Sequence, residues 1–285
     1  MSKPPIDFIF FGGEPLAVPV LEELKGADLL PKCIVCNPDR PQGRKMLLTP
    51  PPAKVWALEH GIRVFQPETL RDQNCIDTLK AENADLFIVV AYGKIIPKAV
   101  LDLPAHGTLN LHPSLLPKFR GPSPIRSAIL ENVRETGVTI MLMDEEMDHG
   151  PIIAQKAVSI SESAWPMRGQ ELDALLAREG GTLLRETVPQ WFAGNIEAHA
   201  QEHEKATYTK KITKDMGEID LSDDPYQNLL KIRAFDGWPG AFFFKEVNGK
   251  KIRVKITDAE LASDGSLKIN RVIPEGRKEM GYTDF

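Results

Sequence analysis

The sequence predicts an α/β fold, in which a Rossmann-like, mostly parallel sheet with flanking helices is followed by a small β-rich unit. Up to residue 204, short apolar runs such as 7–11 and 86–91 alternate with stretches of helical periodicity. After residue 204, short strand-like runs follow one another, and Asn248-Gly249 marks a hairpin turn. A chain of 285 residues is long enough for a large and a small domain. We place them at residues 1–204 and 205–285.

The first domain is expected to open with a strand, a glycine turn and a helix. The run at 7–11 ends at Gly12-Gly13, and helical spacing of apolar residues begins at Ala17. The turn lacks the third glycine of a dinucleotide-binding fingerprint, so it indicates a tight turn rather than nicotinamide binding. The strands expected after it are 32–36, 62–65, 86–91, 108–111, 138–143 and 151–160, with helices at 53–60, 72–82 and 167–192.

Strands that alternate with helices of this length form a parallel sheet with helices on both faces. Within the last of these helices, Gly180-Gly181 is expected to kink or divide the pattern. The second domain is expected to contain a helix at 225–235 and strands at 241–247, 251–256 and 266–272.

Composition argues against a membrane protein and against a passive nucleic-acid coat. Hydrophobic residues make up 42% of the chain and charged residues 26%, and no apolar run approaches the length of a membrane span. The net charge is −5, although residues 205–285 carry 15 Lys and Arg against 13 Asp and Glu. The N-terminus resembles neither a signal nor a transit peptide, and three cysteines suit a reducing compartment, so we expect a cytoplasmic protein.

Cys33 and Cys36 have the spacing of a redox pair. They lie in one expected strand, however, where residues three apart face opposite sides, so we interpret them as core residues. A zinc site would need a second ligand pair at similar spacing, which the sequence lacks, and we expect no metal.

The stretch 107–121 contains the residues best suited to chemistry. Asn110 and His112 are two residues apart on an expected strand, so they project to the same face as a hydrogen-bond donor and a titratable base. Pro113 and Pro117 end the strand, because proline fixes φ and removes a backbone donor. The residues between these prolines must therefore leave the strand and form a loop of defined shape, which can line a cleft.

A carboxylate is expected to join this pair. In open α/β sheets, ligands bind beyond the carboxyl ends of the strands, and the acidic segment 143–150 follows a strand at the same end as Asn110 and His112. We choose Asp148, beside His149-Gly150, as the carboxylate that reaches the imidazole. A solvated acidic loop and a structural histidine are the alternatives.

These residues carry a resemblance to a known family. The segments 110–117, 120–121 and 147–150 resemble the motif of enzymes that transfer a formyl group from 10-formyltetrahydrofolate. More narrowly, the chain is similar to the methionyl-tRNA formyltransferase family from about residue 6 to about residue 280. The segments that carry this narrower resemblance are 37–44, 64–67, 89–93, 135–141 and 208–212.

The resemblance implies that an amine attacks the formyl carbon of 10-formyltetrahydrofolate, with no metal and no covalent intermediate. Asn110 would donate a hydrogen bond to the oxyanion, an interaction typically worth about 3 kcal/mol. His112 would donate to the oxyanion or shuttle a proton, and Asp148 would orient the imidazole and help to remove the amine proton. The residues expected to bind folate are Ser114, Leu115, Leu116 and Pro117, with the pterin in an apolar pocket near Tyr92 and Ile95.

The acceptor is indicated by a proline-braced basic loop at residues 38–52. Its cations could hold phosphates, and the apolar residues 46–48 could wedge against an end base pair. An ordinary solvated basic loop is the alternative. The resemblance implies that this loop enters the acceptor arm of the initiator tRNA. The residues expected to bind tRNA are Arg40, Arg44, Lys45, Lys210, Lys211 and Lys214.

The chain departs from the family pattern in two places. Pro113 stands where these enzymes often carry a glycine. After Ile256, one short turn and one last strand leave too little chain for a closed five-stranded oligonucleotide-binding barrel, so we expect an abridged, OB-like domain. We also expect weaker tRNA affinity, or tRNA held chiefly by the basic residues named above.

We therefore predict a monomeric cytoplasmic enzyme that formylates the amino group of methionyl initiator tRNA and has no membrane partner. One alternative is formylation of a small amine such as an amino-sugar nucleotide, which the shortened tail favours. Another is a folate- or RNA-binding protein without turnover. A protein without turnover would lack at least one of the catalytic residues, whereas Asn110, His112 and Asp148 are all present.

Overall fold

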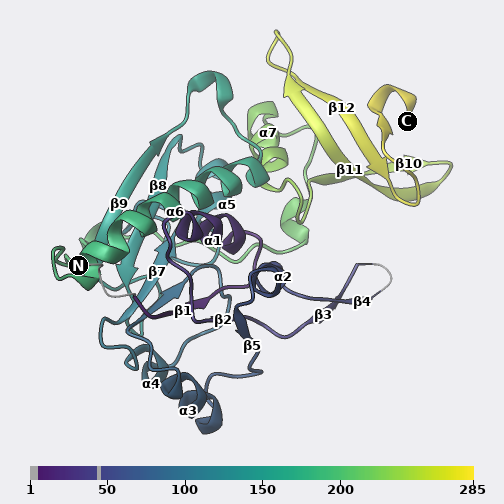
Figure 1. The fold of residues 1–285 in the computed structure, drawn as a ribbon. Coiled ribbons are helices and arrows are strands. Elements are labelled where there is room, and N and C mark those ends of the chain that lie inside the picture. Colours follow the sequence, from purple (N-terminus) through teal and green to yellow (C-terminus); the bar gives the residue numbers. More distant parts are fainter. Residues whose placement is uncertain (1–5, 44–45) are drawn as a thin grey trace. The chain divides into compact units, whose positions relative to one another are not determined.

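The computed structural model describes residues 6–43 and 46–285, which form two compact units (Figure 1). The larger unit comprises the chain up to Arg120, Gly137–Val158 and Ala174–Thr207. The smaller unit comprises Gly121–Thr136, Ser159–Asp173 and Tyr208–Phe285. The chain thus passes between the units several times, and the last passage lies close to the predicted boundary at residue 204.

The larger unit is built on a seven-stranded sheet in the order β5-β2-β1-β6-β7-β8-β9. The first five strands of this order run parallel, whereas β8 runs antiparallel to β7. The predicted α/β class is confirmed, and β8 runs opposite to its neighbour β7 inside the sheet. The strands are β1 (Phe8–Phe11), β2 (Cys33–Val35), β5 (Arg63–Phe65), β6 (Leu86–Val89), β7 (Thr108–His112), β8 (Glu135–Leu142) and β9 (Ile152–Ser159).

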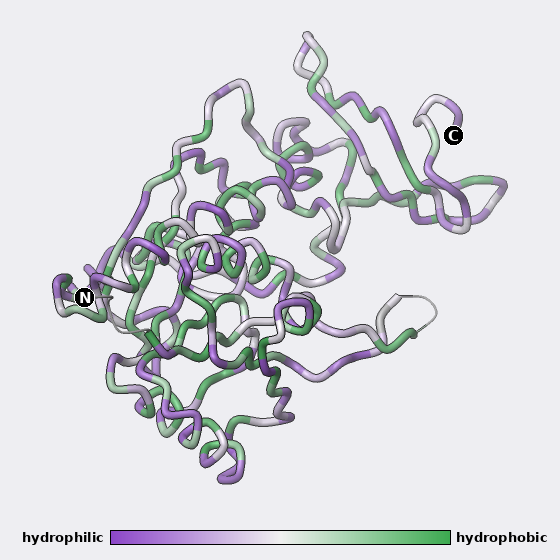
Figure 2. Tube along the Cα trace, in the orientation of Figure 1, coloured by the Kyte–Doolittle hydropathy of each residue, from purple (hydrophilic) through white to green (hydrophobic). Residues whose placement is uncertain are grey.

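Helices cover both faces of this sheet. The helices α3 (Gln73–Ala81) and α4 (Lys98–Leu101) pack against the face that carries Phe11 and Phe87. Figure 1 shows α1 (Ala17–Lys25) and α6 (Gly169–Phe192) on the opposite side. The strands between these layers are among the most hydrophobic segments of the chain (Figure 2), as expected of strands buried on both faces.

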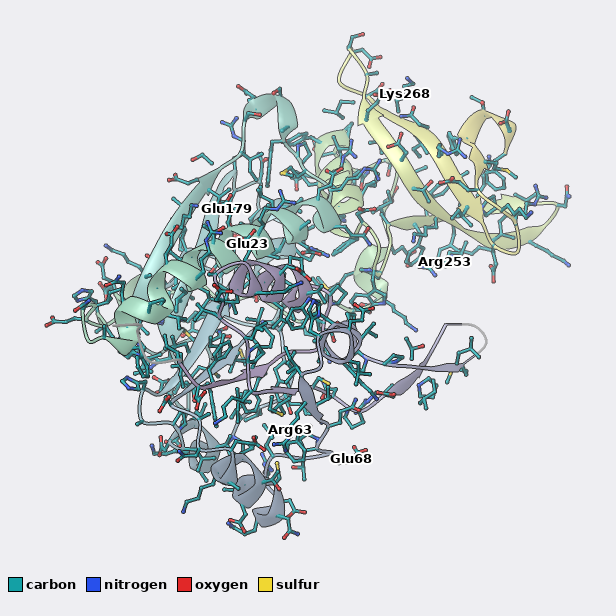
Figure 3. The ribbon with its side chains drawn as sticks, in the orientation of Figure 1. Glu23, Arg63, Glu68, Glu179, Arg253 and Lys268 are labelled. Carbon is teal, nitrogen blue, oxygen red and sulfur yellow. The ribbon has the colours of Figure 1, made fainter. Side chains whose placement is uncertain are left out.

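The helix α6 runs without interruption through Gly180 and Gly181, so the expected division is wrong. The two glycines instead permit close packing. A Cβ on Gly180 would lie 2.5 Å from a methyl carbon of Leu111 in β7, and one on Gly181 would lie 2.7 Å from the Cβ of Glu23 in α1. The side chain of Glu23, labelled in Figure 3, also accepts from the guanidinium of Arg185 on α6 at 3.0 Å.

The proline-braced segment between β2 and α2 (Pro52–Glu59) forms a hairpin of two short strands, β3 (Arg40–Gln42) and β4 (Leu47–Thr49). The carboxylate of Asp39 anchors the start of this hairpin, since it accepts from Lys54 at 2.8 Å and from Gln66 at 2.8 Å. The hydrogen bond from Lys54 lowers the pKa of Asp39 below its usual value.

The smaller unit contains α5 (Pro124–Leu130), α7 (Pro225–Ala234) and an antiparallel four-stranded sheet in the order β10-β11-β12-β13. Its core includes Ile232, Phe243, Val254 and Val272. Arg253 of β11, labelled in Figure 3, lies 3.7 Å from the ring centre of Phe242. The strands are β10 (Phe242–Val247), β11 (Lys250–Leu261), β12 (Leu267–Pro274) and β13 (Met280–Gly281).

The predicted β-rich C-terminal part is therefore confirmed as an open sheet. The sequence patterns missed β13, which is two residues long, and underestimated β11, which is twelve residues long. The pairing of β11 with β12 shifts register near Asp258. An irregularity of this kind bends a strand without ending it.

Candidate active site

The strand β7 is the base of the candidate site. Asn110 and His112 alternate with Leu109 and Leu111, and both leucines are buried. The pairing partner of His112 on β8 is Thr139. Alternation therefore directs the amide and the imidazole to one face, and the site lies where the direction of the sheet reverses.

His112 is 4% exposed, and both of its ring nitrogens face acceptors. The Nε2 atom lies 2.9 Å from the carbonyl oxygen of Phe119, and Nδ1 lies 3.6 Å from a carboxylate oxygen of Asp148. Since a carbonyl can only accept, Nε2 carries a hydrogen. Nδ1 and the Asp148 carboxylate form an ion pair when the imidazole is protonated.

The expectation that the acidic segment follows a strand at the same end as His112 is wrong, because β8 is antiparallel to β7 and Leu142 at its carboxyl end pairs with Leu109. Asp148 still lies 3.6 Å from the imidazole, because its loop turns sharply. Its own φ is +51°, in the left-handed region that aspartate tolerates better than most residues. Gly150 passes so close to β8 that a Cβ there would lie 1.9 Å from the carbonyl oxygen of Leu142. The Asp-His-Gly sequence thus provides a carboxylate, a turn and the glycine that the turn requires.

Among the described residues, the side chain of Asn110 forms no hydrogen bond, and it is partly exposed. Asp148 is also partly accessible, with 14% of its side chain exposed. The side-chain amide of Asn110 is therefore available to a ligand on the face that it shares with His112.

The loop after β7 is tied to the neighbouring strands by its backbone. The hydroxyl of Thr139 donates to the carbonyl of Ser114 at 2.6 Å and accepts from the backbone of Leu116 at 3.2 Å. The amide of Gln155 donates to the carbonyl of Leu116 at 2.7 Å. These bonds fix the loop beside His112, and the sequence patterns had not indicated Thr139 or Gln155.

The residues expected to bind folate lie in several environments. Within the loop, the Ser114 hydroxyl donates to the carbonyl of Lys118 at 2.6 Å, and Leu116 is 3% exposed. Tyr92 is 2% exposed with its ring against Phe11, whereas Ile95 is 80% exposed. Tyr92 and Ile95 therefore do not share one apolar environment, and contact between these residues and folate stays a prediction. The side chains of Leu115 and Pro117 are partly exposed.

The residues expected to bind tRNA belong to both units. Arg40 is exposed on β3, and the apolar residues 46–48 at the other end of the hairpin are each more than 60% exposed. Arg44 and Lys45 lie outside the described residues. In the smaller unit, Lys210, Lys211 and Lys214 are exposed. Their binding to tRNA also stays a prediction.

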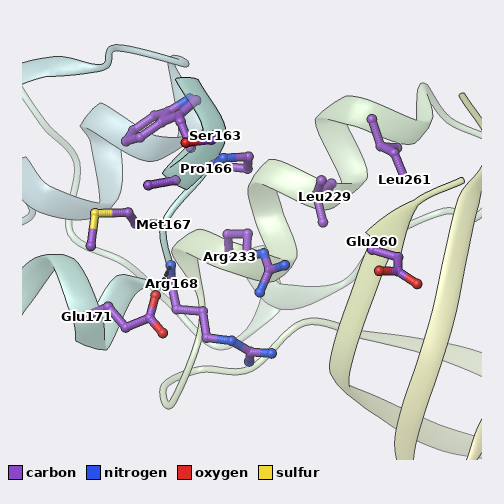
Figure 4. A pocket seen from close by; sticks show the side chains of 11 residues that line it. Ser163, Pro166, Met167, Arg168, Glu171, Leu229, Arg233, Glu260 and Leu261 are labelled. Carbon is purple, nitrogen blue, oxygen red and sulfur yellow. Dashed lines mark hydrogen bonds between the residues drawn. The ribbon is translucent and has the colours of Figure 1, made fainter. Parts of the chain in front are cut away.

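The smaller unit also contains a hollow of about 270 Å³, with Arg168 and Arg233 on its wall (Figure 4). Arg168 is paired with Asp236 and Asp258. Burial and the nearby charge of Arg168 lower the pKa of Arg233, whose Nε is buried without a hydrogen-bond partner in the described structure. Glu171 and Glu260 line the same hollow, so it presents charges of both signs.

Within residues 6–43 and 46–285, no three His, Cys, Asp or Glu side chains are grouped as a metal site. The same part of the chain contains no helix that is both long and apolar enough to span a membrane. The three cysteines are buried thiols. Burial raises the pKa of Cys33 and of Cys36 to about 11, which disfavours thiolate chemistry at this pair.

Two family models match the chain. The model described as formyl transferase matches residues 6–168, and the model described as formyl transferase, C-terminal domain, matches residues 211–266. The first match contains Asn110, His112 and Asp148, together with the loop that follows β7.

Two curated proteins resemble nearly the whole chain. The methionyl-tRNA formyltransferase of Chloroflexus aggregans is 43% identical over 274 residues, which cover 96% of this chain and 86% of the relative. That of Listeria welshimeri is 38% identical, over 97% of this chain and 94% of the relative. Among solved structures, HypX from Aquifex aeolicus in complex with tetrahydrofolic acid matches with a TM-score of 0.64 at 17% identity, over 99% of this chain and 47% of HypX.

Proposed function

Because the chain belongs to the methionyl-tRNA formyltransferase family, we propose that it transfers the formyl group of 10-formyltetrahydrofolate to the amino group of methionyl initiator tRNA. The observation that carries this proposal is the 43% identity over 96% of the chain to an enzyme of that name. The arrangement of Asn110, His112 and Asp148 supports it independently, because these groups suit the reaction chemically.

In this reaction the amine nitrogen of the methionyl group attacks the formyl carbon. A new C–N bond forms, and the formyl oxygen becomes an oxyanion. The bond from carbon to N10 of the folate then breaks, the amine loses a proton, and N10 gains one. The site must therefore stabilise an oxyanion and move a proton between two nitrogens.

The carboxylate and the imidazole suit the proton transfer. The Asp148 carboxylate lies 3.6 Å from Nδ1 of His112, and the hydrogen bond from Nε2 to Phe119 fixes the orientation of the ring. A protonated imidazole can donate toward the oxyanion or N10, and the carboxylate can accept the amine proton, directly or through water.

The side-chain amide of Asn110 suits the oxyanion. It carries two N–H donors and no charge, and it projects from β7 on the same face as His112. A neutral donor held on a central strand needs no reorganisation when the oxyanion forms, and one such donor contributes about 3 kcal/mol.

The exposed hairpin β3–β4 supports a large acceptor. The side chains of residues 46–48 face solvent on a segment whose start is held by Asp39, Lys54 and Gln66. Exposed apolar side chains on an anchored segment are typical of a surface that binds a macromolecule. A small amine in the site would not need them.

The proposal is tested by incubating the protein with 10-formyltetrahydrofolate labelled in the formyl group. One reaction contains methionyl initiator tRNA and the other an amino-sugar nucleotide. We expect label on the methionyl amine, at a rate that falls when the tRNA is uncharged. Label transferred to the sugar amine alone would overturn the proposed acceptor. Absence of transfer to either substrate would overturn the proposed reaction.

A further inference from the structure

Gln201 is buried in the larger unit beneath the loop that carries Asp148. Its side-chain NH2 donates to the backbone carbonyl of Asp148 at 3.0 Å and to that of Gly150 at 2.7 Å. These two carbonyls lie on either side of His149. One amide therefore holds the backbone of the turn that points the Asp148 carboxylate at His112.

The other end of the same amide is held by a buried arginine. The side-chain oxygen of Gln201 accepts from Nε of Arg120 at 3.1 Å and from its Nη2 at 2.6 Å. Arg120 is 1% exposed, so this charge-assisted contact lies away from competing water. The arginine leaves one orientation for the amide, with its oxygen toward the guanidinium and its nitrogen toward the turn.

The surrounding side chains add to this support. Nη2 of Arg120 also donates to Nδ1 of His203 at 2.9 Å, and the ring of His203 stacks on that of His149 with the ring centres 4.2 Å apart. Nδ1 of His149 lies 2.7 Å from the Asp144 carboxylate. The segment 201–203 therefore contacts the acidic turn both at its backbone and at a side chain.

The hydrogen-bond requirements at position 201 are specific. One side must accept from a guanidinium, and the other must donate to two carbonyls. Glutamine meets both requirements. Glutamate keeps the acceptor but loses the donors when it is ionised, and lysine has donors but no acceptor. A change of one functional group can thus release the turn while preserving the contact with Arg120.

We propose that Gln201 is a positioning residue for the transfer reaction: it sets the place of the Asp148 carboxylate relative to His112 through the backbone of residues 148–150. This inference rests on the proposed function, since it concerns the same Asp148 and His112. Gln201 does not contact the reacting atoms. Its contribution depends entirely on the carboxylate that it positions.

The test is a double-mutant cycle with Gln201→Glu and Asp148→Asn. We expect Gln201→Glu to lower kcat by about 10- to 100-fold, as small misplacements of a catalytic group do, with little change in KM for either substrate. In the Asp148→Asn background, the same substitution should change kcat by less than about 2-fold, because the positioned carboxylate is already lost. An equal loss in both backgrounds, or an unchanged kcat for the single variant, would overturn the inference.

The matched control is Gln190→Glu, an exposed glutamine on α6 whose side-chain oxygen accepts from Asn195. The same charge change there should leave kcat unaltered. Gln201→Met gives a second variant that removes all four polar contacts without introducing a carboxylate. Its kcat should fall at least as far as that of Gln201→Glu.

A measurement without an acceptor separates this inference from the proposed function. The ring signals of His112 can be assigned in NMR spectra from their loss in His112→Asn. In Gln201→Glu they should move toward the positions they take in Asp148→Asn, and unmoved signals would contradict the inference. If the native protein formylates no methionyl-tRNA, the proposed function fails, and the ring signals still decide the role of Gln201.

Discussion

At the scale of single residues, His112 combines deep burial with two acceptors. Its Nε2 is held by the Phe119 carbonyl and its Nδ1 faces the Asp148 carboxylate. The first contact is supplied by the loop after β7 and the second by the loop after β8. The imidazole is therefore contacted by loops that follow two neighbouring, antiparallel strands.

Replacing His112 by asparagine should lower kcat by about 100- to 10,000-fold, because proton transfer by a positioned side chain contributes that much. The free energy of unfolding should fall by only about 1–2 kcal/mol, since one buried hydrogen bond to Phe119 is lost. Single-turnover kinetics and thermal unfolding measure the two effects. The control is His199→Asn, an exposed histidine whose backbone pairs with Ile152. Equal activity in the two variants would contradict the assigned role.

The sequence was sufficient for Asn110 and His112, because strand alternation is a local rule. It indicated Asp148 through an expected meeting of carboxyl strand ends, which the antiparallel direction of β8 contradicts. The sequence did not indicate Gln201 at all. That residue lies 53 positions after Asp148 in a polar segment without a periodic pattern, and its partners are backbone carbonyls. Arg120 was noted only within a motif. Its burial, at 1% exposure, is indicated by no local pattern.

At the scale of elements, the hairpin β3–β4 exposes Leu47 and Leu48 at 64% and 68%. The combined change Leu47→Ser and Leu48→Ser should raise KM for methionyl-tRNA by at least about 10-fold, because about 1.4 kcal/mol corresponds to a factor of ten and fully burying one leucine contributes about 1.5–3 kcal/mol. The KM for the formyl donor should not change. The measurement is initial-rate kinetics with each substrate varied in turn.

The control for that change is Leu58→Ser on α2, a leucine that is 63% exposed and outside the hairpin. It should leave both KM values as they are. An unchanged KM for methionyl-tRNA in the hairpin variant would indicate that the exposed leucines do not meet the acceptor.

The strand β2 and the residue after it carry two buried thiols with a measurable effect on alkaline stability. Burial raises the pKa of Cys33 and Cys36 from 9.0 to about 11. In the unfolded chain these thiols ionise from about pH 9, whereas in the folded chain they stay neutral. Their contribution to the free energy of unfolding is therefore complete below pH 9 and is lost as the pH rises toward 11.

Urea unfolding at pH 8 and pH 10 checks this prediction. The native chain should lose more stability between the two pH values than a Cys33→Ala, Cys36→Ala double variant, which cannot ionise at these positions. The double variant is less stable at both pH values because it leaves small cavities, so the comparison concerns the difference between pH values. Equal losses in the two proteins would contradict the burial argument.

The helix α6 illustrates how a local rule can be overridden. Two adjacent glycines weaken a helix, and they suggested a break in the sequence. In the structure the helix continues, because Leu111 and α1 pack so closely against the two positions that larger residues would overlap them. The cost in helix propensity is offset by tertiary contact, which sequence periodicity does not describe.

At the scale of the whole molecule, the α/β class and most strands followed from alternating apolar runs and helices. The reversal of β8, the strand β13 and the hairpin β3–β4 did not. Strand direction depends on which strands become neighbours, and two- or three-residue strands are too short to show a period. The division into two units also involves passages of the chain at several points, which a single boundary does not represent.

The charge of the smaller unit leads to a prediction about salt. If Lys210, Lys211 and Lys214 contact tRNA phosphates, their joint replacement by glutamine should weaken tRNA binding and reduce the steepness of its salt dependence by about one unit per lost contact. Filter binding between low and moderate salt measures both. Lys268→Gln is the control, because Lys268 is paired with Glu260. A triple variant with the salt slope of the native chain would exclude these contacts.

The position of β7 between β6 and β8 has a consequence for engineering. The strand β7 pairs with β6 on one side and with β8 on the other, so a redesign that moves Asn110 or His112 must rebuild the middle of a sheet. In the described part of the chain, β3 and β4 pair with each other and with no other strand, so this hairpin can be exchanged for a foreign one without disturbing the middle of the larger sheet. Laboratory evolution toward new amines should therefore accumulate its successful changes in the hairpin and conserve the strand.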